Sequence, residues 1–94
     1  MYIAEEIETL YEEMKVVFRE LTSTQWHIQA LDYIFAKPVF RNSSFTKDSG
    51  IPIETAKRIT RLLSEQELLV TIEEASGRKP ALYSFEPLMK LVRV

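Results

Sequence analysis

The apolar residues between Tyr2 and Leu21 recur at alternating spacings of four and three, in a stretch that contains neither glycine nor proline. This spacing places them on one stripe of an α-helix, so the pattern predicts a single helix over the whole stretch. The stripe is as narrow as the seam of a coiled coil, although Tyr11 and Phe18 widen it toward an ordinary core face. Two interpretations stay open, a helix packed on its own domain and a dimerisation seam between subunits. The seam would consist of Ile3, Ile7, Leu10, Met14, Val17 and Leu21.

A second helix is expected after Thr22-Ser-Thr-Gln25, which fits a capping box. In that motif the first hydroxyl bonds an amide three residues on, and the glutamine reaches back. The helix should run to about Phe35 and end at Lys37-Pro38, because the residue before a proline is forced out of the helical region. Residues 38–41 then form a short extended segment. The side chains expected to face the core are Trp26, Ala30, Leu31, Ile34 and Phe35.

Two helices joined by a glycine turn are predicted next. Residues 42–44 are all capping types, so a short helix should begin there and run to Ser49. Gly50 should stop it, since the residue past a helix end often takes a positive φ, and Pro52 suits the first turn of the next helix. That helix, Ile53 to Gln66, separates into two faces. Its apolar face holds Ala56, Ile59, Leu62 and Leu63, and its polar face holds Glu54, Lys57, Arg58, Arg61 and Glu65.

The rest of the chain predicts a β-hairpin and a last short helix. Residues 68–74 alternate in polarity, and residues 81–85 form a second short strand. A cluster of turn residues at 75–80 joins them, with a basic tip. A short apolar segment at 88–92 should be helical. One face of the first strand would carry Leu68, Val70 and Ile72.

The order of these elements is that of a winged helix-turn-helix. The expected fold is therefore α+β and mostly α. Residues 1–22 form a long N-terminal helix, and residues 23–94 form the winged helix-turn-helix domain.

The composition narrows the possible functions. A length of 94 residues with 46% hydrophobic and 28% charged side chains fits one folded domain. The two glycines are too few for a dinucleotide-binding or P-loop motif. With no cysteine and His27 as the single histidine, no metal, no cofactor and no catalytic activity are expected, and His27 is best explained by a capping or surface role. No apolar run is long enough for a bilayer span, so no membrane partner and a cytoplasmic location are expected.

The charges are sorted along the chain. The net charge is −5 over residues 1–36, +4 over residues 37–61 and −1 over residues 62–94, which together give the overall −2. The basic block coincides with the predicted helix-turn-helix. A basic surface of this kind favours an anionic partner such as nucleic acid.

Double-stranded DNA is the partner that this architecture suggests. In DNA-binding members the second helix of the pair lies in the major groove, where Arg and Lys contact base edges and phosphates. The alternative is a protein-interaction or dimerisation module without DNA binding, because exposed helix faces are usually charged and Glu54 and Glu65 lie on the same face. The candidate nucleic-acid-binding residues are Ser43, Ser44, Thr46, Lys47, Thr55, Lys57, Arg58, Arg61, Arg78 and Lys79.

Three motifs in order resemble a known family. They are Gln29-Ala-Leu-Asp-Tyr-Ile-Phe-Ala-Lys-Pro38, Ser49-Gly-Ile-Pro-Ile-Glu-Thr-Ala-Lys-Arg58 and Gly77-Arg-Lys-Pro-Ala-Leu-Tyr83. Over residues 23–88 the chain is similar to the C-terminal winged-helix domain of bacterial Fic proteins. In that family an N-terminal catalytic domain transfers AMP from ATP to a protein hydroxyl, using a histidine followed by a Gly-Asn-Gly-Arg loop.

The resemblance implies a non-catalytic accessory domain. Neither the catalytic signature nor the inhibitory helix of the family occurs here, since Thr9 and Glu13 have the inhibitory spacing but Met14 follows them. The chain would then be a C-terminal fragment of an adenylyltransferase, with residues 1–22 as the connector helix and the Fic catalytic domain as partner. A homodimer along the seam and a stand-alone transcription regulator are the remaining alternatives.

Overall fold

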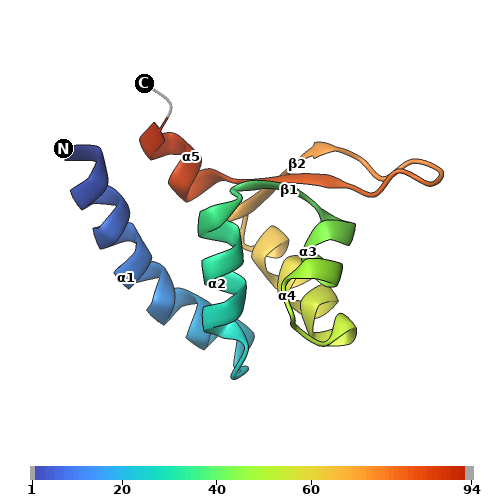
Figure 1. The fold of residues 1–94 in the computed structure, drawn as a ribbon, viewed down its shortest axis with the longest axis horizontal. Helices are drawn as coiled ribbons and strands as arrows, with labels where there is room; N and C mark the ends of the chain where they lie inside the picture. The colour runs from blue at the N-terminus through green and yellow to red at the C-terminus, as the bar shows by residue number, and fades with distance from the viewer. Residues whose placement is uncertain (1, 93–94) are drawn as a thin grey trace.

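The computed structural model describes residues 2–92. For residues 2 and 3 it describes the backbone but not the side chains. Five helices and three strands follow one another in residues 2–92 (Figure 1). In chain order they are α1 (Tyr2–Thr22), α2 (His27–Ala36), β1 (Val39–Arg41), α3 (Asn42–Asp48), α4 (Ile53–Glu65), β2 (Leu69–Glu73), β3 (Leu82–Phe85) and α5 (Glu86–Val92). Each predicted element is present, and the largest error in a boundary lies at the start of α2.

The three strands form one antiparallel sheet in the order β1-β3-β2. Strand β3 lies in the middle, because Ser84 is opposite Val39 on one side and Val70 on the other. The sequence predicted the hairpin of β2 and β3 but did not indicate that β1 joins it. With α2, α3 and α4 against one face of this sheet, the fold is a winged helix-turn-helix preceded by a long N-terminal helix, as predicted.

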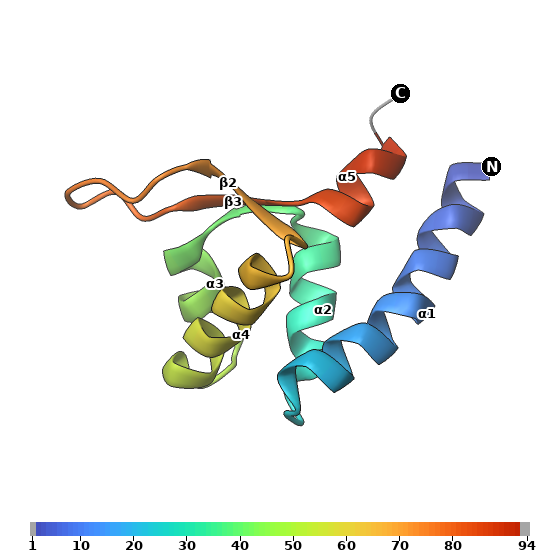
Figure 2. The same ribbon diagram turned by 180° about the vertical axis from the view of Figure 1, so that it is seen from behind.

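The core lies between the helices and the inner face of the sheet. Its largest fully buried side chains include three phenylalanines, Phe18 of α1, Phe45 of α3 and Phe85 of β3. The rings of Phe18 and Phe85 meet edge to face with their centroids 5.9 Å apart. Helix α1 therefore belongs to the same core as the winged helix and packs on α2, α4 and α5. The wing, which is the hairpin of β2 and β3 with the turn at residues 74–81, projects from the opposite end of the molecule (Figures 1 and 2).

The predicted capping box at residues 22–25 is wrong. The Thr22 hydroxyl is buried and donates to the carbonyl of Phe18 within α1, at 2.6 Å. Ser23 takes a positive φ of 50° and ends α1, so α2 begins only at His27. His27 Nδ1 lies 2.7 Å from the carbonyl oxygen of Thr24. This contact ties the ring to the turn before α2, but no side chain caps the amides at the start of that helix, so a capping role for His27 stays a prediction.

The outer face of the sheet carries exposed apolar side chains. Leu69 is buried opposite Phe85, so the alternate side chains Val70 and Ile72 face outward and are 43% and 53% exposed. The register shifts between Thr71 and Glu73, which makes this a bulged strand. Strand β2 lies at the edge of the sheet, where unpaired backbone groups could pair with another chain, and a bulge there interrupts such pairing.

A hydrogen bond from the Tyr11 hydroxyl to Asp32 Oδ1 joins α1 to α2. This bond, followed by desolvation and the nearby carboxylates, raises the pKa of Tyr11 to about 12. Because the folded-state pKa exceeds the unfolded value, the contribution to stability is complete below about pH 10 and is lost as the pH rises through the folded value. We expect an absorbance titration of tyrosinate to show a component near pH 12 that disappears in Tyr11→Phe. An identical high-pH component in the variant would contradict this contact between the helices.

Candidate nucleic-acid interface

The turn between α3 and α4 determines how α4 is presented. Gly50 has a φ of 80°, which a residue with a side chain rarely adopts, and a Cβ there would lie 3.3 Å from Gln29 Nε2. Ile51 is buried below the turn, and its amide donates to Ser49 Oγ at 3.3 Å. The predicted stop at Gly50 is confirmed. Pro52 is the residue before the helix rather than a member of its first turn.

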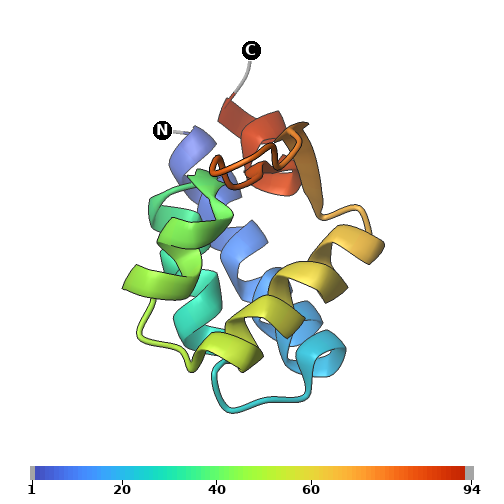
Figure 3. The same ribbon diagram turned by 90° about the vertical axis from the view of Figure 1, so that its right-hand side faces the viewer.

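Helix α4 holds one face in the core and the other in solvent. The predicted apolar residues Ala56, Ile59 and Leu63 are buried. Thr60 is buried as well, which the sequence pattern missed, and its hydroxyl is satisfied by the carbonyl of Lys57 at 3.0 Å. Because the helix is anchored along its length, the side chains on its other face project from a rigid support. Figure 3 shows α4 below the wing.

Four of the predicted site residues meet on the exposed face of α4. A shallow hollow of about 570 Å³ is lined by Glu54, Thr55, Lys57, Arg58 and Arg61. Lys57 Nζ lies 3.9 Å from Glu54 Oε2, and Arg61 Nε lies 3.9 Å from Glu65 Oε2. Ion pairs this long between exposed side chains are weak, so both cations remain available to an anionic ligand. Within residues 2–92, no acidic partner lies in ion-pair distance of Arg58.

The candidate residues on α3 differ in what they offer. Ser43 and Lys47 are exposed, and Ser44 is half-buried. The Thr46 hydroxyl contacts the carbonyl oxygens of Asn42 and Ser43 at 3.2 and 3.1 Å. Its proton is therefore engaged inside α3, and Ser43 and Ser44 are the better donors to a phosphate.

The wing ends in a tight turn that presents Arg78. Ser76 and Lys79 exchange two backbone hydrogen bonds of 2.9 and 2.8 Å, and Gly77 takes a φ of 57° in the turn between them. Arg78 is exposed at the tip. Lys79 is less free, because its Nζ lies 3.6 Å from Glu73 Oε1.

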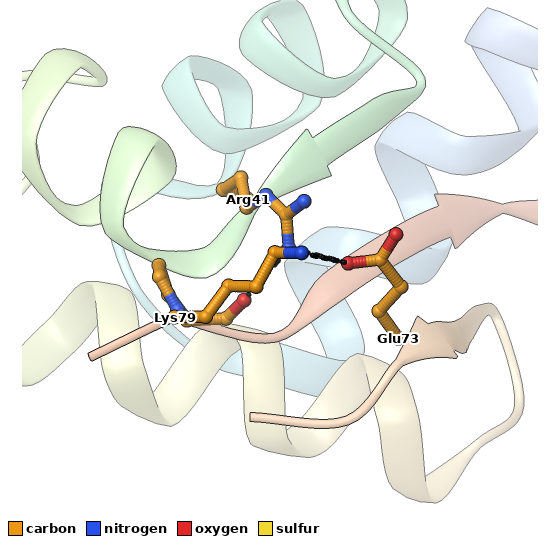
Figure 4. A network of polar contacts seen from close by, with 4 residues as sticks. Arg41, Glu73 and Lys79 are labelled. Carbon is orange, nitrogen blue, oxygen red and sulfur yellow. Dashed lines mark hydrogen bonds and ion pairs between the residues drawn. The ribbon is translucent and has the colours of Figure 1, made fainter. Parts of the chain in front are cut away.

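Arg41 is a cation that the sequence pattern did not single out. Its Nη1 is 3.0 Å from Glu73 Oε1 and donates to the carbonyl of Pro80, also at 3.0 Å (Figure 4). The hydrogen bond from Arg41 and the charges of Arg41 and Lys79 lower the pKa of Glu73. This network ties β1 to both strands of the hairpin at the base of the wing. No sequence pattern indicated this ion pair, because Arg41 and Glu73 approach each other only when β1 joins the sheet.

The apolar stripe of α1 packs largely on its own domain. Ile7, Leu10, Met14 and Leu21 are half-buried against the core cluster, and Val17 is half-buried too. The side chain of Ile3, which completes the predicted seam, lies outside the described part. These contacts favour the interpretation of a helix packed on its own domain, and dimerisation along the stripe stays a prediction.

No protein-family model, curated protein or solved structure matches this chain. Among the helices of residues 2–92, none is both long and apolar enough to span a bilayer. The same residues contain no group of three or more potential metal-ligating side chains. Topology and the arrangement of charge around α4 and the wing are therefore the features that point to a function.

Proposed function

We propose that this protein binds double-stranded DNA, with α4 in the major groove and the wing tip against the adjacent backbone. The observation that carries the proposal is the row of the exposed Lys57 and Arg61 and the half-buried Arg58 on a helix whose opposite face is buried in the core. An α-helix fits the major groove, and arginine bonds a guanine edge with two donors. Arg78 at the wing tip supplies a second cationic contact, on a different element.

The distribution of charge over the molecule supports the same orientation. The segment that includes α1 carries a net −5, and the helix-turn-helix segment carries +4. Helix α1 and the wing lie at opposite ends of the molecule (Figure 1). A duplex would be attracted to the α4 side and repelled by the α1 side, so the encounter is steered before contact is made. Glu54 and Glu65 oppose binding locally, and their long ion pairs to Lys57 and Arg61 must yield to phosphate.

A role as the accessory domain of a Fic-type adenylyltransferase is a separate proposal. It rests on the three motifs at residues 29–38, 49–58 and 77–83. Two of these motifs contain glycines at turns that the fold uses, Gly50 before α4 and Gly77 in the wing. Such turns occur in winged helices of many functions, so they support the fold more strongly than they support the family.

Fluorescence anisotropy of a labelled duplex across a salt series tests the DNA proposal. We expect a Kd of about 1–100 μM at physiological salt for a duplex of arbitrary sequence, with log K falling by about 0.9 per decade of salt for each phosphate contact. Contacts from α4 and the wing together predict a slope of about −3 to −4. No binding at about 50 mM salt, or an affinity that salt leaves unchanged, would refute the proposal.

A further inference from the structure

A polar cleft separates α4 from the inner face of the hairpin. It has a volume of about 460 Å³, and its lining includes Asn42, Lys57, Arg61, Ser64, Thr71 and Tyr83. The sequence had already indicated Asn42 as a capping residue at the start of α3, whereas Ser64 and Thr71 were not singled out. A cavity of this size is large enough for a small organic ligand.

Four elements build the cleft, α3 with Asn42, α4, β2 and β3. Lys57, Arg61 and Ser64 recur at spacings of four and three on α4, so they share one face of that helix. Thr71 and Tyr83 are cross-strand partners in the hairpin. They lie on the same side of the sheet as the buried Leu69 and Phe85, two positions along each strand. The inner face of the sheet therefore continues beyond the core into the cleft and turns polar there.

Two buried polar atoms in the cleft lack a partner. Among the described residues, none hydrogen-bonds Asn42 Oδ1 or Ser64 Oγ, although both atoms are inaccessible to solvent. A buried polar group without a partner costs free energy, and native proteins contain few of them. Both atoms lie below the surface of the cleft, so the two side chains reach a ligand by rotating toward it, and a flip lets Asn42 offer its amide nitrogen instead of its oxygen. A ligand that hydrogen-bonds these two side chains would remove the cost.

The charges at the cleft favour an anion. Lys57 and Arg61 are the two cations of the lining, and their side chains are 60% and 65% exposed. Glu65 also lines the cleft, with its Oε2 3.9 Å from Arg61 Nε. An anion with several acceptor oxygens would bind Arg61 more closely than Glu65 does, and the exposed Glu65 would turn into solvent.

We propose that this cleft binds a phosphate group, carried either by a small phosphorylated molecule or by a nucleic-acid backbone. Lys57 and Arg61 neutralise the charge, and the Ser64 hydroxyl and the Asn42 amide donate to the phosphate oxygens from opposite walls. A tetrahedral group with several acceptors fits donors that converge from several directions, and arginine binds phosphate in a forked geometry. The site does not depend on the DNA proposal, because inorganic phosphate alone should occupy it.

Titration of the ¹⁵N-labelled full chain with inorganic phosphate, followed by amide chemical shifts, tests the site. We expect saturable shifts at Asn42, Ser64 and Thr71, with a Kd in the millimolar range. Ser64→Ala should weaken binding about tenfold, because it removes one hydrogen bond to a charged group. It should not lower the Tm of the ligand-free protein, because the deleted hydroxyl has no partner there. Arg61→Gln should weaken binding, and Arg19→Gln, an equal change of charge on the exposed face of α1, should not.

A second arm repeats the anisotropy measurement on Ser64→Ala with duplex DNA. A loss of affinity of about tenfold would identify a backbone phosphate as the occupant, and an unchanged affinity would identify a free phosphorylated molecule. Saturable shifts from inorganic phosphate without any DNA binding would sink the DNA proposal and leave the site standing. Shifts that spread over all lysines and arginines without saturating, or equal phosphate affinity in Ser64→Ala and the parent, would overturn the site.

Discussion

Combined replacement of Lys57, Arg58 and Arg61 by alanine is expected to lower the affinity for duplex DNA about 500-fold at 0.1 M salt. For each phosphate contact, log K rises by about 0.9 when the salt concentration falls tenfold. Between 1 M and 0.1 M salt, three contacts therefore add about 2.7 to log K, which is a factor of about 500 in affinity. The slope of log K against log salt should become shallower by the same 2.7. If Arg58 bonds a base edge instead of a phosphate, its loss costs about 1–3 kcal/mol and acts on sequence preference rather than on the slope.

The variant should remain folded. Lys57 and Arg61 are exposed, Arg58 is half-buried and none of the three belongs to the buried face of α4, and alanine has the highest helix propensity. The matched control is Lys15→Ala, Arg19→Ala and Lys90→Ala on α1 and α5, which removes the same charge from helices that carry none of the candidate DNA-binding residues. We expect this control to change the affinity only slightly. Equal losses in the two variants would mean that overall charge governs binding and that α4 has no special role.

Local signals in the sequence account for most of the fold. The two faces of α4 follow from its periodicity, and the stop before it follows from Gly50. The hairpin follows from alternation around a cluster of turn residues. Each of these signals lies within a few residues of the structure that it determines, so a single sequence suffices to find it.

The errors and omissions have a different origin. At residues 22–25 a capping box and a continued helix compete for the same threonine. Burial of Thr22 beside Phe18 decides in favour of the continued helix. The addition of β1 to the sheet depends on pairing between residues more than forty positions apart, such as Phe40 with Tyr83. No local pattern contains that information.

Some residues of the candidate site were likewise predictable from local sequence, and others were not. The cations of α4 were predictable because helix periodicity places them on the face opposite the core. The ion pair of Arg41 with Glu73 and the polar cleft at Asn42 and Ser64 were not, since each joins elements that meet only in the folded chain. Thr46 is the opposite case, a predicted site residue whose contact with DNA stays a prediction. A hydroxyl of suitable type and position is committed to the backbone of its own helix.

Phe18→Ala is expected to destabilise the protein by about 3–5 kcal/mol, the usual cost of removing a fully buried phenylalanine. A chain of this length has a total stability of about 5–14 kcal/mol, so the variant would lose a large share of it and its Tm should fall by roughly 15–25 °C. The reason is the position of Phe18. It lies in α1, outside the winged helix-turn-helix, yet its ring packs against Phe85 at the centre of the shared core.

Thermal and urea unfolding of Phe18→Ala, compared with Val16→Ala, test whether α1 packs on the rest of the domain in solution. Val16 lies two residues away on the same helix and is 44% exposed, so its replacement should change the stability by less than about 1 kcal/mol. If α1 were only a connector to another domain or an unoccupied seam between subunits, Phe18 would be exposed and the two variants would behave alike. A large difference between them would instead mean that α1 is structurally part of the domain. Any partner of this helix would then contact its acidic outer face or the part of the apolar stripe that stays accessible.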